Sequence, residues 1–129
     1  MKKVLLILLP ILLFNCNKDK NIDTIQYDLK IDKCLDIADT EYELCLESIN
    51  DSRCPSDVDC VWEGDAVVSF KLNSNTENKS FTLQTHKSFQ QDTLINGFKI
   101  KLLGVSPYPI STTPTSQSDY SVELSISDQ

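Results

Sequence analysis

Residues 62–72 read WEGDAVVSFKL, and the alternation in this stretch decides the fold. The even positions from Trp62 to Leu72 are apolar or small, whereas polar and charged residues such as Glu63 and Lys71 occupy most of the odd positions. A period of two residues is typical of a strand that turns one face to the core and the other to water. The stretch that begins at Tyr120 repeats the pattern, and the sequence therefore predicts an all-β protein.

Shorter stretches carry the same pattern. Apolar residues alternate over 25–31, at Phe81 and Leu83, and over 98–102. Residues 34–49 also fit a helical stripe, but a strand over 41–49 agrees better with the flanking pattern. We expect a small, disulfide-stapled, antiparallel β-sandwich or barrel of about six to seven strands.

Two connections can be recognised from their residue types. Asn96-Gly97 lies between two apolar stretches, and this dipeptide is typical of a type I′ hairpin turn, in which both central residues have positive φ. Residues 106–118 are rich in Pro, Ser and Thr and predict a loop that leads to the last strand.

The chain begins with a segment typical of export. Lys2 and Lys3 precede an apolar run over 4–14, which is too short to span a bilayer and fits the central region of a signal peptide. Residues 13–16, LFNC, resemble the lipobox of bacterial lipoproteins, although Asn15 is larger than the residue usually found before the cysteine. The resemblance implies cleavage before Cys16 and attachment of lipid to its sulfur.

These features divide the chain into a signal peptide over 1–15, a lipidated tether over 16–24 and a β domain over 25–129. Asn17 is not the aspartate that retains lipoproteins at the inner membrane of some bacteria, which favours the outer membrane. Removing Lys2 and Lys3 from a formal net charge of −7 leaves −9. Such a charge repels phosphate backbones, so we expect no nucleic-acid partner. The lipid anchor instead makes a membrane the expected partner.

Five cysteines are consistent with this view. Lipid takes Cys16, and four cysteines remain for two disulfides in an oxidising compartment. Three pairings are possible; we favour Cys54–Cys60, which closes a short loop, and Cys34–Cys45, which requires a turn near residues 38–40. A zinc site is disfavoured because the close CxxC pairs are missing.

Residues 51–64, DSRCPSDVDCVWEG, form the densest motif. They resemble a family of small, largely uncharacterised bacterial lipoproteins in which Asp-Ser-Arg-Cys-Pro is followed by a second cysteine, a tryptophan and a small residue. The resemblance implies an exported, anchored β domain without an agreed activity. Independently of the family, Trp62 is expected to pack on the disulfide within the strand, and Arg53 to pair with Asp51 or Asp57.

The loop 51–60 and the Pro-Tyr loop are the candidate contact surfaces, because rigid loops on a scaffold commonly bind partners. The candidate binding residues, expected to be exposed, are Asp51, Arg53, Asp57, Asp59 and Tyr108. An alternative is a calcium site built from the five carboxylates of residues 51–65, although their spacing does not match an EF-hand loop. We assign no metal and no cofactor.

We expect no enzymatic activity. The single histidine, His86, lies in a polar stretch and is expected to be an exposed loop residue. The chain has no GxSxG motif and no glycine-rich phosphate loop. The predicted function is a non-catalytic envelope domain that binds a protein or glycan or has a structural role. The alternative is a small envelope hydrolase using acidic residues or His86, which a pocket holding His86 would favour.

Overall fold

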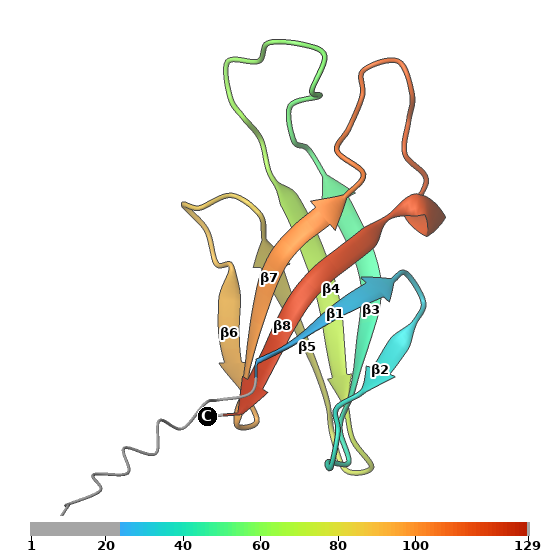
Figure 1. Ribbon diagram of the computed structural model, residues 1–129, viewed down its shortest axis with the longest axis vertical. Helices are drawn as coiled ribbons and strands as arrows, with labels where there is room; N and C mark the ends of the chain where they lie inside the picture. Colours follow the sequence, from blue (N-terminus) through green and yellow to red (C-terminus); the bar gives the residue numbers. More distant parts are fainter. Residues whose placement is uncertain (1–23, 129) are drawn as a thin grey trace, which may run out of the picture.

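This computed structural model describes residues 24–128, which form two antiparallel sheets of four strands each (Figure 1). The first sheet has the order β1 (Ile25–Lys30), β8 (Ser121–Asp128), β7 (Phe98–Ser106) and β6 (Asp92–Ile95). The second has the order β2 (Cys34–Asp36), β3 (Glu43–Asp51), β4 (Ala66–Asn73) and β5 (Asn78–Gln84). A three-residue 3-10 helix, Gln117–Asp119, precedes β8.

The core lies between the two sheets and follows from the alternation in the sequence. In β4, Val68, Phe70 and Leu72 are buried, while the residues between them are only partly buried. Val122 and Leu124 of β8 are fully buried from the other sheet. Each such side chain stabilises the fold by about 1.5–3 kcal/mol relative to exposure. The prediction of an all-β sandwich is confirmed, with eight strands and two separate sheets instead of a closed barrel.

Strand β4 begins at Ala66 and not at Trp62, so this part of the prediction is wrong. Gly64 has a φ of +73°, and a Cβ at this position would lie 2.0 Å from the carbonyl oxygen of Ser52. The tight approach bends the chain before the regular strand starts. Trp62 is consequently placed in the preceding loop, where 53% of its surface is exposed, and it does not face the core.

Strand β3 confirms the strand predicted over 41–49 and adds a bulge. The register with β4 shifts between Leu46 and Ser48, which inserts one extra residue. Leu44, Leu46 and Ile49 are therefore all buried, although simple alternation would turn Ile49 outward. The short strand β2, which pairs with β3, was not predicted.

Both predicted disulfides are present. Cys34 and Cys45 are cross-strand partners in β2 and β3 with Cα atoms 4.0 Å apart, and the turn between them contains Asp39 at a φ of +61°. Cys54 and Cys60 have Cα atoms 5.9 Å apart within the loop that precedes β4. The pairings inferred from spacing are thus those that the fold forms.

The sandwich has two unlike ends (Figure 1). The turn end holds Ile25, Asp128 and the tight turns at 74–77 and 96–97; the latter is the predicted type I′ turn, with φ of +49° at Asn96 and +84° at Gly97. The loop end holds the three long connections 52–65, 85–91 and 107–120. The two ends are separated by the full length of the strands.

The predicted signal peptide, Cys16 and the tether as far as residue 23 lie outside the described residues. Over residues 24–128, no helix has the length and apolar character needed to cross a membrane.

Candidate functional site

A groove of about 500 Å³ opens at the loop end. The three long connections meet there against β7, and each contributes side chains to the wall. Among the lining residues are Arg53, Glu63, His86, Lys87, Gln91 and Tyr108. A volume of this size lies within the range of small-molecule sites, which is about 300–1,000 Å³.

Arg53 forms one wall of the groove and is held by four acceptors. Its Nε and Nη2 donate to the two carboxylate oxygens of Asp51, each at 2.8 Å. Nη1 donates to the carbonyl oxygen of Val105 at 2.8 Å, and Nη2 also donates to that of Pro107 at 3.0 Å. The predicted pairing with Asp51 is confirmed. The expected exposure of both residues is wrong, because their side chains are only 6% (Arg53) and 3% (Asp51) exposed.

The titration of Asp51 reflects this environment. Burial alone would raise the pKa of its carboxyl, but the hydrogen bonds and positive charge of Arg53 outweigh burial and lower the pKa. The hydroxyl of Tyr120 donates to Asp51 at 3.1 Å. Burial, then the hydrogen bond to Asp51 and the negative charge of that carboxylate, raise the pKa of Tyr120. Asp51 is therefore an ionised, internally satisfied carboxylate.

Tyr108 lies on the face of the Arg53 guanidinium, whose central carbon is 4.4 Å from the ring centroid. This cation–π contact fixes one face of the ring. About half of the residue (51%) remains exposed. Tyr108 is thus the predicted binding residue that the structure leaves accessible at the groove.

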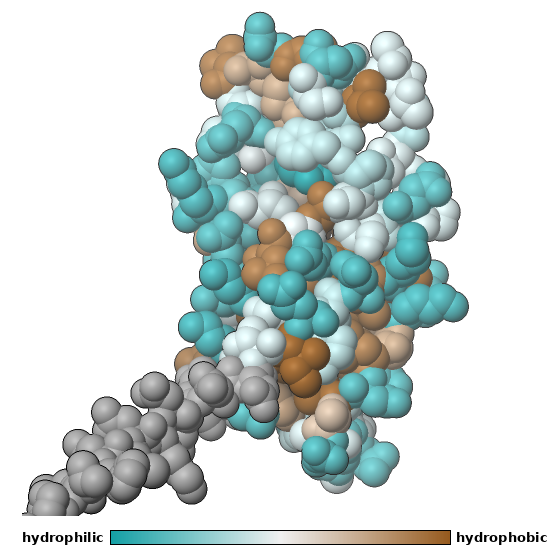
Figure 2. Space-filling view, in the orientation of Figure 1, coloured by the Kyte–Doolittle hydropathy of each residue, from teal (hydrophilic) through white to brown (hydrophobic). Residues whose placement is uncertain are grey.

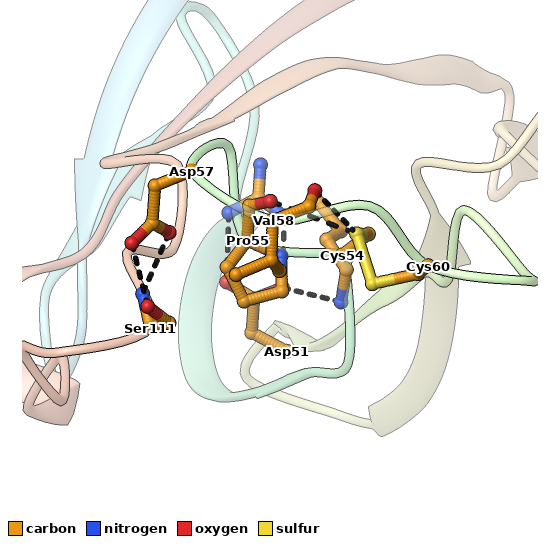
Figure 3. Close-up of a disulfide and its surroundings, with 8 residues drawn as sticks. Asp51, Cys54, Pro55, Asp57, Val58, Cys60 and Ser111 are labelled. Carbon is orange, nitrogen blue, oxygen red and sulfur yellow. Dashed lines mark hydrogen bonds and ion pairs between the residues drawn. A yellow bond between two sulfur atoms is a disulfide. The ribbon is translucent and has the colours of Figure 1, made fainter.

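Asp57 joins two loops instead of pairing with Arg53 (Figure 3). Its carboxylate accepts hydrogen bonds from the backbone N–H of Ser111 at 2.9 Å and from the Ser111 hydroxyl at 2.5 Å, and these bonds lower its pKa. The backbone N–H of Ser56 donates to the Pro109 carbonyl at 3.0 Å. The loop closed by Cys54–Cys60 is therefore tied to the loop that carries Tyr108. Asp59 is exposed and takes no part in this connection.

His86 is not the exposed loop residue expected from the sequence, since its side chain is only 8% exposed. The imidazole lies between Trp62, at 4.6 Å between ring centroids, and Phe89, at 5.6 Å. Its Nε2 contacts Glu63, and its Nδ1 accepts a hydrogen bond from the backbone N–H of Ser88 at 3.2 Å. Trp62, which was expected to pack on the disulfide, thus has a ring contact with His86. Both ring nitrogens of His86 have protein partners.

The five carboxylates considered as calcium ligands do not converge. Asp51 pairs with Arg53, Asp57 with Ser111 and Glu63 with His86. Asp65 accepts hydrogen bonds from the Thr85 hydroxyl at 3.1 Å and from the His86 backbone N–H at 2.9 Å. Across residues 24–128, the one group with metal-ligand proximity is Cys34, Glu43 and Cys45, and its two sulfurs are bonded to each other. The calcium hypothesis therefore finds no support in this geometry.

Exposed apolar side chains gather at the same end of the molecule as the groove. Of nine large apolar residues exposed in the described part of the chain, seven lie in the three long connections or on β7 at the loop end. They are Val58, Val61, Trp62, Phe89, Leu103, Tyr108 and Ile110. Figure 2 shows apolar groups at the loop end, at the top of the view, and further apolar groups along the sides of the molecule. Exposed apolar patches are a common feature of contact surfaces.

The structure brings only part of the predicted site together. Arg53, Asp51 and Tyr108 are adjacent, whereas Asp57 serves a neighbouring connection and Asp59 faces water. Sequence reasoning missed the groove residues Lys87 and Gln91 and the pairing of residue 63 with residue 86. No local pattern signals that pairing, because the two residues are separated by a complete hairpin.

No family model, no curated protein and no solved structure matches this chain. The fold and site define a two-sheet β-sandwich with a groove at its loop end. Its function has to be argued from that geometry.

Proposed function

We propose that the chain is a lipid-anchored protein of the bacterial cell envelope whose sandwich is a non-catalytic binding domain. One observation carries the binding part of the proposal. The groove and the exposed apolar side chains collect at the loop end, whereas Ile25, at which the chain from Cys16 enters the domain, lies at the opposite end. The partner is an envelope protein or a glycan. We place the protein at the outer membrane in preference to the inner membrane.

The arrangement suits presentation away from a membrane. A lipid on Cys16 would hold the turn end toward the bilayer through a tether that spans at most about 30 Å at 3.3–3.6 Å per residue. Two or three acyl chains anchor a protein stably, whereas one chain binds only marginally. The loop end would then face the compartment in which a partner is met.

The loop end is also preorganised. The Cys54–Cys60 disulfide, the Asp57–Ser111 hydrogen bonds and the Arg53 contacts to Val105 fix the connections relative to one another. Loops that are already ordered lose less conformational entropy on binding. This rigidity favours a recognition surface.

The runner-up is an envelope hydrolase that uses His86 or acidic residues. It gains one observation, since His86 lies in the groove wall. A general base needs a nitrogen free to accept a proton. Here Nδ1 accepts from Ser88 while Nε2 is engaged by Glu63, and the carboxylates of Asp51 and Asp57 have partners of their own. Binding therefore accounts for the groove better than catalysis does.

Site-specific photo-crosslinking in intact cells tests the proposal. A photoreactive residue is placed at Val61, on the loop end, or at the matched exposed position Asn75, on the turn end. We expect a discrete adduct from position 61 and none from position 75, with the adduct lost when Cys16→Ser removes the anchor. Equal labelling from both positions, or no adduct from position 61 combined with no saturable glycan binding, would contradict the proposal.

A further inference from the structure

Two aromatic side chains lie at or next to the groove, and about half of each residue is exposed to solvent. Tyr108 lines it, with one face against Arg53. Trp62 lies at the rim, because its neighbour Glu63 and its ring partner His86 both line the groove. The face of an aromatic ring carries partial negative charge and attracts weakly positive C–H groups, such as those on the apolar face of a sugar ring.

Two ionic groups of the groove have hydrogen-bonding partners within the protein. Arg53 is paired with Asp51, and Glu63 is paired with His86. Glu63 and Lys87 are the charged lining residues that remain exposed, and they belong to a strongly acidic chain. Glu63 and Lys87 carry opposite charges, so a ligand in this groove needs no net charge of its own, and an anionic ligand would be repelled by the surrounding domain.

Hydrogen-bonding capacity is left over on the same wall. Gln91 donates from Nε2 to the Thr85 carbonyl at 3.0 Å, which leaves its Oε1 as an acceptor. The Glu63 side chain is two-thirds exposed, so its second carboxylate oxygen is accessible alongside the Lys87 ammonium. Such groups satisfy hydroxyls, which both donate and accept.

We infer that the groove binds a neutral saccharide, stacked on Trp62 and Tyr108 and hydrogen-bonded by Gln91, Glu63 and Lys87. This names the ligand class of the binding function proposed above and rests on it. Aromatic faces combined with hydrogen-bonding side chains of no net charge match a sugar, which presents an apolar ring face and a hydroxyl edge. A protein partner would use the exposed apolar tip at Val58, Val61 and Ile110 in preference to the groove.

Trp62 is the only tryptophan in the chain, so its fluorescence reports directly on the rim of the groove. The full chain, purified in a detergent without a sugar headgroup, is titrated with triacetylchitotriose, cellotriose and maltotriose. Tri-galacturonic acid serves as the anionic comparison. We expect a saturable change in Trp62 emission with at least one neutral trisaccharide, with half-saturation below about 1 mM, and a weaker response to the acidic one.

Tyr108→Ala should weaken binding and raise the half-saturation concentration at least tenfold. Leu94→Ala, which removes an exposed apolar side chain from β6 outside the groove, should leave it unchanged. Trp62→Phe removes the fluorescent reporter, so binding to this variant is measured by calorimetry. Melting temperatures confirm that each variant is folded. No saturable change with any neutral trisaccharide at millimolar concentration, or an equal loss with Leu94→Ala, would overturn the inference.

The crosslinking result at position 61 separates this failure from that of the binding function. A discrete protein adduct without any saccharide response leaves the binding function standing and removes the saccharide. The absence of both signals removes both.

Discussion

Arg53 and Asp51 form a bidentate ion pair inside the loop end, with Nε–Oδ1 and Nη2–Oδ2 distances of 2.8 Å. The same guanidinium donates to the carbonyl oxygens of Val105 and Pro107 and supports the ring of Tyr108. A single side chain from the connection that follows β3 thus positions the connection that follows β7. The geometry of the groove depends on this pair.

Removing Arg53 should destabilise the domain strongly. Arg53→Ala leaves the carboxylate of Asp51 buried without a partner, and such a change costs about 3–5 kcal/mol. Chemical denaturation of the purified chain measures the free energy of unfolding. Arg53→Lys keeps the charge but loses the fork geometry, so its free energy of unfolding should lie between those of the wild type and Arg53→Ala. A loss below about 1 kcal/mol for the alanine variant would show that the pair behaves as an exposed one.

The cost of Arg53→Ala should also depend on pH. The pKa of Asp51 is lowered in the folded protein, so the contribution of this carboxylate is complete above the unfolded value of about 3.9 and is lost as pH falls through the folded pKa. In Arg53→Ala, burial without the cation raises the pKa, so protonation relieves the variant. The difference in unfolding free energy between wild type and variant should shrink from pH 7 to pH 4. A constant difference would contradict this assignment.

Gly64 and Gly104 should respond differently to alanine. A Cβ at Gly64 would meet the Ser52 carbonyl oxygen at 2.0 Å in a backbone with φ of +73°, whereas nothing lies within 4 Å of a Cβ at Gly104. We expect Gly64→Ala to lower the unfolding free energy by about 2–4 kcal/mol and Gly104→Ala to change it by less than about 1 kcal/mol. Thermal unfolding of both variants measures this. Equal effects would show that the close approach is absent.

The two disulfides should contribute similar stability but serve different ends of the molecule. Loop closure over sequence separations of 11 and 6 residues corresponds to about 2–3 kcal/mol each. Alanine replacement of Cys54 and Cys60 should also shift Trp62 emission, because that bridge anchors the loop before Trp62. Replacement of Cys34 and Cys45 should leave the emission unchanged. A shift in emission with the second pair instead would contradict the placement.

The protonation of His86 follows from its contacts. Because Nδ1 accepts a hydrogen bond from Ser88, the neutral ring carries its proton on Nε2, toward Glu63. Nitrogen-15 NMR of the imidazole at alkaline pH should show the Nε2–H tautomer. Observation of the Nδ1–H tautomer would free Nε2 to act as a base and would favour the hydrolase.

The strands could be predicted from sequence because alternation is a local property. The two-residue spacing of Val68, Phe70 and Leu72 is enough to predict that they are buried. The turn at Asn96-Gly97 could be predicted because both residues tolerate positive φ. Trp62 shows the limit of such patterns. Its position continues the alternation of β4 in the sequence, but the close approach of Gly64 to Ser52 bends the chain, so the strand does not extend back to Trp62.

The site could be predicted only in part, since its contacts join distant residues. The pairing of Arg53 with Asp51 spans two residues and was visible in the sequence. The contacts of Arg53 with Val105 and Pro107, and of Trp62 with His86, join separate loops. Only the folded sandwich brings those loops together at one end.

The intact mass of the native protein, extracted from the cell envelope, tests the central claim most directly. An anchored, oxidised domain predicts a chain that begins at Cys16 and carries a diacylglyceryl group. It also predicts no alkylation before reduction and four alkylated cysteines, Cys34, Cys45, Cys54 and Cys60, after reduction. A chain that retains Met1, or free thiols before reduction, would contradict the account.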